Sequence, residues 1–265
     1  MSENLSWLNG QLRETPQIAT NNRGLLVGLG VFETIKVSEG IPHFLNRHLR
    51  RLHAGCELLG LSGVDLDEIQ QAATAVINAN PQDHELARLR ITITGQGDGG
   101  GIDTLISMTS MNPWPATTSC TVVPWIRNER SAIAGVKSTS YAENLIAQRW
   151  AQERGFSEGV FVNSLGELSE GTTSNIFLVK GDQVLTPHIN CGVLPGIVRE
   201  VLLENDLARE SILLIEDLVG ADEVFITSST RGVHPVAHLG ERKFDVVGQV
   251  TQDVQKAFSL IKTDS

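Results

Sequence analysis

The chain has 265 residues, of which 41% are hydrophobic and 20% are charged, a balance that is typical of a globular protein with one large or two modest domains. Its formal net charge of -10 argues against nucleic acid or an anionic membrane surface as the main partner, and no apolar run has membrane-spanning length. The N-terminus lacks a secretory layout, and three widely separated cysteines form no metal spacing, so we expect a cytoplasmic protein.

The first 110 residues predict a small mixed α/β domain. Val31 to Val37 has the composition of a strand, and the run SEG after it is typical of a turn. Apolar residues then recur at helical spacing and predict a helix from about Asn46 to Gly60. Further elements follow in chain order: a second helix at about 65–78, and strands at 89–94 and 104–109 on either side of the glycine-rich run GQGDGGG.

Two patterns in this region indicate no site. Gly95, Gly97 and Gly100 satisfy the spacing G-x-G-x-x-G, but a dinucleotide site requires a helix after the glycines, and a β-rich segment follows instead. A hairpin loop that could cover an active site is the better interpretation. His43 and His53 lie five residues from His48 on either side, which places the three on different helix faces and predicts no metal site.

The run MNPWP, with two prolines in five residues, predicts an interdomain linker at 111–117. A larger C-terminal domain at 118–265 follows. Its expected elements are strands at 120–126, 159–163, 176–179 and 224–227, the middle two hairpin-like, a helix at 141–154, and a helix that begins at Pro195-Gly196.

Five segments resemble, in the same order, the class IV aminotransferases, the family of fold-type IV enzymes that use pyridoxal 5′-phosphate (PLP). The segments are NNRGLLVGLGVFETIKVSEGIPHFLNRHLRRL, the region of Lys137 and Tyr141, EGTTSNIF from Glu170, LPGIVR, and ADEVFITSSTRGVHPV. The family includes branched-chain, D-amino acid and amine aminotransferases and 4-amino-4-deoxychorismate lyase. The resemblance implies a two-domain α/β (α+β) fold with PLP in the cleft between the domains. It also implies a homodimer in which a partner loop helps to close the pocket.

The resemblance implies roles for four residues. Lys137 would form the Schiff base with PLP and move the proton between the substrate Cα and the cofactor C4′. Glu170 would hold the pyridine nitrogen protonated. Arg51 would bind the phosphate, which suits a bidentate guanidinium. His48, one helical turn earlier, could join the phosphate network or pack in the core.

The remaining cofactor contacts implied by the family come from backbone amides and hydroxyls. The amides of Ile197 and Val198 open a helix and would favour an anion. Family members often carry threonine where this chain has Val198, so only the backbone amide remains there. Ser229 and Thr230 match the second hydroxyl position. Tyr141, one turn after Lys137, could reach the cofactor or pack under the helix.

Departures from the family pattern bear on the substrate. The usual Gly-Asp-Gly of the opening hairpin is Gly28-Leu29-Gly30, and Thr34 and Lys36 replace residues that are common in branched-chain members. The run GQGDGGG has no arginine, so the carboxylate trap of D-amino acid members is expected to be absent. Lys36 and Arg231, together with Thr34, are the candidate substrate-binding residues, although either cation could be a surface charge.

The function that these patterns favour is a PLP-dependent aminotransferase, which moves an amino group from an amino acid or primary amine to a keto acid or ketone by ping-pong transfer. 4-Amino-4-deoxychorismate lyase, which eliminates pyruvate to give 4-aminobenzoate, is the alternative: the strand FETIKV and the short chain favour it, and Tyr141 argues mildly against it. A non-catalytic small-molecule binder is the third possibility, against which Lys137, Glu170 and Arg51 argue.

Overall fold

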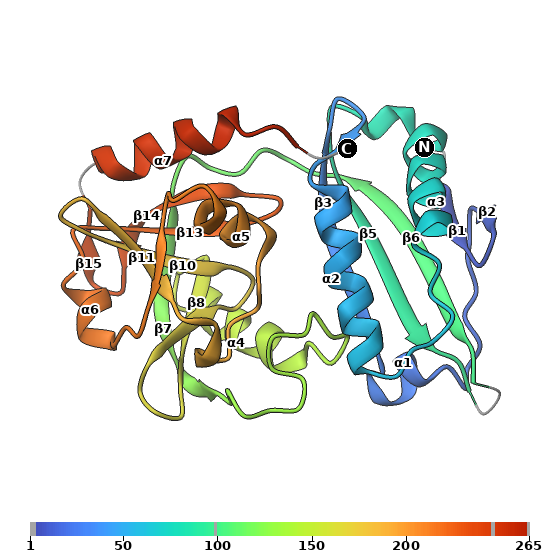
Figure 1. Ribbon diagram of the computed structural model, residues 1–265, viewed down its shortest axis with the longest axis horizontal. Helices are drawn as coiled ribbons and strands as arrows, with labels where there is room; N and C mark the ends of the chain where they lie inside the picture. The colour runs from blue at the N-terminus through green and yellow to red at the C-terminus, as the bar shows by residue number, and fades with distance from the viewer. Residues whose placement is uncertain (1–3, 98–99, 245–246, 264–265) are drawn as a thin grey trace. The chain divides into compact units, whose positions relative to one another are not determined.

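The computed structural model describes residues 4–97, 100–244 and 247–263, which fall into two compact units (Figure 1). Of the described residues, the first contains 4–97, 100–113, Val136–Ser140 and Thr263. The second contains Trp114–Gly135 and Tyr141–Lys262. The change of unit at Pro113 lies inside the segment expected as a linker. The return of Val136–Ser140 to the first unit differs from a simple division of the chain at residue 118.

The first unit is built on a six-stranded antiparallel sheet with the strand order β2-β1-β6-β5-β3-β4. The strands are β1 (Ser6–Leu8), β2 (Gln11–Arg13), β3 (Gly30–Ser38), β4 (Ile41–Pro42), β5 (Leu86–Gly95) and β6 (Ile102–Ser110). The helices are α1 (Arg23–Val27), α2 (Leu45–Leu58) and α3 (Leu66–Ala79), and η1 (Pro81–Asp83) is a 3₁₀ turn.

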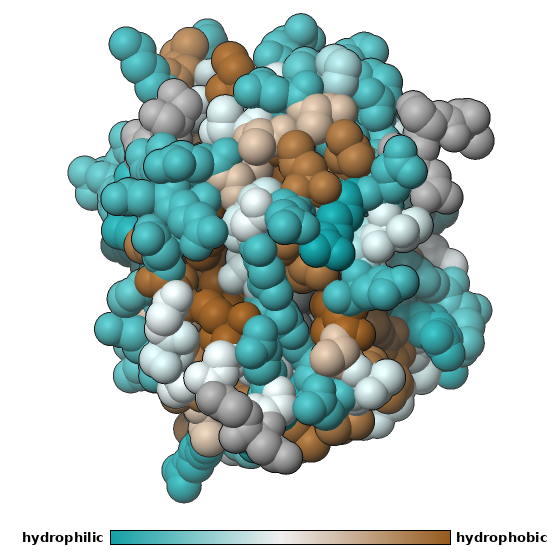
Figure 2. Space-filling view, turned by 90° about the vertical axis from the view of Figure 1, so that its right-hand side faces the viewer, coloured by the Kyte–Doolittle hydropathy of each residue, from teal (hydrophilic) through white to brown (hydrophobic). Residues whose placement is uncertain are grey.

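Alternation along the strands determines which face of this sheet is covered by helices. Ile35, Leu89 and Ile91 point to one face and form a core with the apolar sides of α2 and α3. The opposite face carries Phe32 and Lys36, among others. Figure 2 views the side of this unit and shows hydrophilic side chains with hydrophobic patches between them.

The glycine-rich run joins two paired strands, as expected. β5 and β6 form an antiparallel hairpin whose register continues to Gly95 opposite Ile102. No helix follows the glycines, so the geometry of a dinucleotide site is absent from the part of this loop that the structure describes. Asp98 and Gly99 at its centre lie outside the described residues.

The second unit contains a nine-stranded mixed sheet in the order β12-β11-β10-β13-β14-β7-β8-β9, with β15 paired to β14. Its strands are β7 (Thr118–Arg127), β8 (Glu158–Asn163), β9 (Leu168–Gly171), β10 (Asn175–Lys180), β11 (Gln183–Pro187), β12 (Arg209–Ser211), β13 (Glu223–Ser228), β14 (Gly232–Leu239) and β15 (Arg242–Lys243). The helical elements are α4 (Ala142–Gln152), η2 (Ile189–Cys191), α5 (Ile197–Glu204), α6 (Ile215–Val219) and α7 (Gln249–Leu260).

The two strands expected to be hairpin-like, β8 and β10, each form a hairpin with a strand of their own. β8 pairs with β9, and β10 pairs with β11 across the Gly181-Asp182 turn. On one face of the sheet, Val198 and Leu202 of α5 pack against Phe177 and Phe225, whose rings stack at a centroid distance of 4.7 Å. This packing fixes where α5 begins.

The described part of the chain has neither a membrane-spanning helix nor a cluster of metal ligands. No helix in it is long and apolar enough to cross a membrane. Residues 4–97, 100–244 and 247–263 also bring together no group of three or more His, Cys, Asp or Glu side chains that could hold a metal ion.

Candidate active site

Lys137 is positioned by a short segment that runs beside β3. The amide of Phe32 donates to the carbonyl of Lys137 at 2.9 Å, and the amide of Thr139 donates to the carbonyl of Gly30 at the same distance. On this edge of β3, β4 pairs only with the far end of the strand. The part of the edge near Gly30 and Phe32 is therefore available for these two hydrogen bonds. The Lys137 Nζ lies 4.5 Å from the centroid of the Phe32 ring, and the side chain is half-buried. A lysine that packs on an aromatic ring is partly desolvated, as a Schiff-base lysine must be.

The sheet face on which Phe32 lies is rich in cations. Register places Thr34 of β3 opposite Arg90 of β5 and Lys36 opposite Arg88, and the Arg90 guanidinium lies 3.8 Å above the Phe32 ring. Sequence analysis identified Lys36 and missed both arginines. The alternation in LARLRITIT, which puts them on one face, was the signal that could have found them.

Arg51 and His48 of α2 both contact a buried carboxylate on β3. The Arg51 guanidinium donates through Nε to Glu33 Oε1 at 2.8 Å and through a terminal nitrogen to Oε2 at 2.5 Å. His48 Nδ1 lies 2.6 Å from Oε2. Burial alone would raise the pKa of Glu33, but Arg51 and His48 lower that pKa to about 2. Burial lowers the pKa of His48, so its imidazole is neutral at pH 7.

Glu170 lies on β9, and its carboxylate is in contact with two groups of the second unit. The Leu194 amide donates to Oε2 at 2.8 Å, and a terminal nitrogen of Arg127 lies 3.4 Å from Oε1. Arg127 also donates to Glu143 at 2.7 Å and lies over the Phe161 ring. The carboxylate therefore has a defined orientation and a cation beside it.

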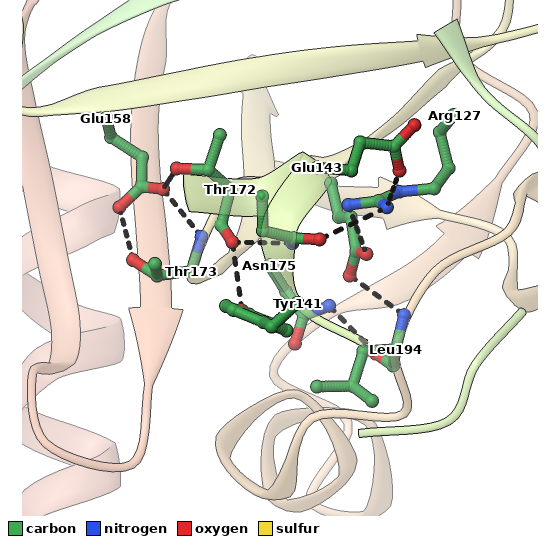
Figure 3. Close-up of polar contacts among 10 residues, drawn as sticks. Arg127, Tyr141, Glu143, Glu158, Thr172, Thr173, Asn175 and Leu194 are labelled. Carbon is green, nitrogen blue, oxygen red and sulfur yellow. Dashed lines mark hydrogen bonds and ion pairs between the residues drawn. The ribbon is translucent and has the colours of Figure 1, made fainter. Parts of the chain in front are cut away.

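Tyr141 stabilises the turn that follows Glu170 through a hydrogen bond. It lies immediately before α4, and its hydroxyl donates to the carbonyl of Thr172 at 3.0 Å (Figure 3). The side-chain amide of Asn144 donates to the same carbonyl at 2.7 Å. On the other side of the turn, Thr172 donates to the buried carboxylate of Glu158. This arrangement supports the interpretation in which Tyr141 packs at the helix start.

Arg231, a candidate substrate-binding residue, has a different partner in the structure. It lies in the turn between β13 and β14, and a terminal nitrogen of its guanidinium is 3.1 Å from Glu158 Oε2, with 4% of the arginine side chain and 0% of the glutamate exposed. The guanidinium lies over Trp114. Because this arginine compensates a fully buried carboxylate, we assign it to the structure of the turn.

The start of α5 offers backbone amides to an anion. Gly196 caps the helix without a side chain, and a Cβ on it would lie 1.9 Å from Asn175 Oδ1, so only glycine fits here. The Val198 side chain is buried in the core, which leaves its amide as the only group that could reach a ligand. Ser229 and Thr230 lie half-buried in the turn after β13.

The residues of each unit fit a phosphate-bearing carbonyl cofactor. The first unit supplies an amine and a guanidinium. It also holds His48, whose Nε2 is buried without a hydrogen-bond partner among the described residues. The second unit supplies a fixed carboxylate and the first amides of α5. In it, the hydroxyls of Ser174 and Thr227 are likewise buried and unpartnered within the described ranges.

Comparison with known proteins shows the family. The family model for amino-transferase class IV matches residues 30–239, so the chain belongs to this family. Aminodeoxychorismate lyase of Bacillus subtilis is 28% identical over 94% of this chain and 92% of its own length. The branched-chain-amino-acid aminotransferase of Escherichia coli K12 is 28% identical over 95% and 91%. The crystal structure of an Escherichia coli branched-chain aminotransferase superposes with a TM-score of 0.89 at 25% identity and covers 97% of this chain and 94% of that one.

Membership of the family confirms the expected fold and the expected cofactor. Enzymes of this family depend on PLP, so the protein is a PLP-dependent enzyme of fold type IV. The roles of individual side chains stay predictions, and so do the homodimer and the cytoplasmic location.

Proposed function

We propose that the protein is an aminotransferase that moves an amino group from an amino acid or primary amine to a keto acid or ketone. This proposal depends above all on the position of the Lys137 amine, which packs on Phe32 beside the cationic sheet face. Membership of the class IV family and the aminotransferases among the relatives support it.

Different residues would bind the cofactor and transfer the proton. When bound, PLP supplies an electron-accepting ring joined to the substrate nitrogen. Lys137 would hold the cofactor and then move the proton at the substrate Cα. Glu170 would keep a proton on the pyridine nitrogen. Arg51 of the first unit is the proposed guanidinium ligand of the phosphate, and the amides of Ile197 and Val198 are the anion-binding groups that the second unit offers.

The cationic sheet face supports a substrate that carries a carboxylate. Lys36, Arg88 and Arg90 extend over two neighbouring strands on the face where the Lys137 amine lies. A carboxylate there would meet positive charge from more than one direction. Thr34, between Phe32 and Lys36 on the same strand face, would add a hydroxyl.

A second candidate is 4-amino-4-deoxychorismate lyase. Its support is the Bacillus subtilis relative, which matches over nearly the whole chain, and the FETIKV sequence of β3. Its substrate also carries carboxylate groups, so the cationic face suits it as well.

One experiment separates the two activities. The PLP-loaded protein is incubated with D- and L-amino acids and a chiral amine, without any acceptor. An aminotransferase converts the cofactor to pyridoxamine phosphate in stoichiometric amounts and releases the keto product. A lyase releases pyruvate from 4-amino-4-deoxychorismate over many turnovers and leaves the cofactor as PLP. The proposal fails if no donor converts the cofactor and the chorismate derivative yields pyruvate.

A further inference from the structure

We infer that Glu33 is a positioning residue for cofactor binding: it holds the Arg51 guanidinium, and the His48 ring beside it, in the orientation that receives the PLP phosphate. This inference rests on the proposed role of Arg51 as the phosphate ligand. The carboxylate itself would not touch the cofactor.

The contacts place Glu33 on one edge of the guanidinium. Its two oxygens take Nε and one terminal nitrogen of Arg51 in a fork, at 2.8 and 2.5 Å. A guanidinium presents its donors in fixed directions, so this fork also fixes the directions of the N–H groups on its other edges. A phosphate would approach along one of those edges.

His48 completes the arrangement from one helical turn away. Because the Glu33 carboxylate is ionised, it can only accept, so the proton on the neutral imidazole belongs on Nδ1. This hydrogen bond sets both the tautomer and the orientation of the ring. The carboxylate therefore orients two side chains of α2 at once.

Packing alone does not explain a carboxylate at this position. Glu33 is 1% exposed and lies between Val31 and Ile35 on the strand face that forms the apolar core. Replacing a buried ionic group with a well-packed apolar one is often neutral or stabilising, so a gain in stability over an apolar side chain does not account for Glu33. A role in orienting Arg51 would explain why a charged side chain occupies this apolar position.

The sign of a binding change distinguishes orientation from simple charge. Glu33→Gln removes a negative charge beside the expected phosphate site, which by Coulomb's law would tighten the binding of an anion. It also breaks the fork, because an amide offers one acceptor and one donor where the carboxylate offers two acceptors. The positioning role predicts weaker binding, which is the opposite sign.

The test compares PLP with pyridoxal, which lacks the phosphate. Dissociation constants are measured by absorbance titration of the apoenzyme without substrate, for the wild type and for Glu33→Gln. Glu85→Gln, at an exposed site of the same unit, is the control with the same change of charge. We expect Glu33→Gln to weaken PLP about ten-fold or more and to change pyridoxal less than two-fold, roughly the effect of misplacing one charge-assisted contact.

Three outcomes would overturn the inference: tighter PLP binding, unchanged PLP binding, or equal weakening of both ligands. Equal weakening would indicate a general structural role. If Glu33→Gln does not fold, Glu33→Asp keeps the charge but shortens the reach, and the same selective loss of PLP affinity is expected of it. No amino donor is present, so failure here leaves the aminotransferase proposal intact, and failure of that proposal leaves this binding result intact.

Discussion

The Arg127 guanidinium lies 3.4 Å from one carboxylate oxygen of Glu170, and β7 and β9 carry these two residues from segments 43 positions apart in the sequence. The Leu194 amide holds the other oxygen at 2.8 Å. The amide donates a hydrogen bond to the carboxylate, and the guanidinium places a positive charge beside it. An acid held in this way keeps its orientation beside a cation, as expected of the group that would hold a proton on the pyridine nitrogen.

Replacing this acid should cost most of the activity. For Glu170→Gln we expect the rate of the amino-donor half-reaction to fall on the order of 100-fold or more, because a neutral amide does not stabilise the protonated pyridine. Glu143→Gln is the matched control, since Glu143 binds the same arginine but is half exposed and has no assigned role. Stopped-flow absorbance measures both, and comparable rates in the two variants would contradict the assignment.

Arg127 should act through Glu170. Arg127→Met removes the cation beside the carboxylate, and we expect the half-reaction to slow about ten-fold, the effect of losing one nearby positive charge. The dissociation constant of pyridoxal phosphate should change less than the rate. Arg130→Met, at an exposed position three residues later, should leave both unchanged. An unchanged rate in Arg127→Met would show that the Leu194 amide is sufficient.

Ionisation of Glu33 should make the folding stability of the protein depend on pH at acidic pH. Its folded-state pKa of about 2 lies below the ordinary value of 4.5, so its contribution to stability is complete above the unfolded pKa and is lost as pH falls towards 2. The difference corresponds to about 3 kcal/mol. Urea unfolding across this pH range should show a smaller loss of stability for Glu33→Gln than for the wild type. If the free energy of unfolding falls equally with pH in the wild type and in Glu33→Gln, the pKa of Glu33 is not lowered in the folded protein.

Arg231 should matter for stability more than for substrate affinity. Arg231→Met leaves the Glu158 carboxylate buried without its cation, which we expect to lower the free energy of unfolding by about 3 to 5 kcal/mol. Urea unfolding measures this loss, and steady-state kinetics measure KM. A variant of full stability with a greatly increased KM would instead support the substrate-binding role that the sequence first indicated.

The sequence predicted those parts of the site that depend on local order along the chain. The strand at β3, the helix at α2 and the helix start at Gly196 follow from periodicity and from capping residues, and Lys137 and Glu170 follow from their place in the family motifs.

Pairings between distant residues could not be predicted in this way. The contacts of Arg127 with Glu170 and of Arg231 with Glu158 join segments 43 and 73 positions apart, and no local spacing reports them. Val136–Ser140 had no strand pattern because hydrogen bonds to one open edge of β3 determine its place. The role of Glu33 was not predicted, because a carboxylate in an apolar strand can be interpreted only once α2 is known to place Arg51 beside it.

The most direct test of the account is the visible spectrum of the PLP-loaded protein, with Lys137→Ala as the reference. The wild type should show the absorbance band of PLP bound through a lysine, and an amino donor should convert it to the band of pyridoxamine phosphate. In Lys137→Ala the first band should be absent and the conversion should fail. A wild-type band that no donor discharges, or a Lys137→Ala variant that converts as the wild type does, would contradict the account.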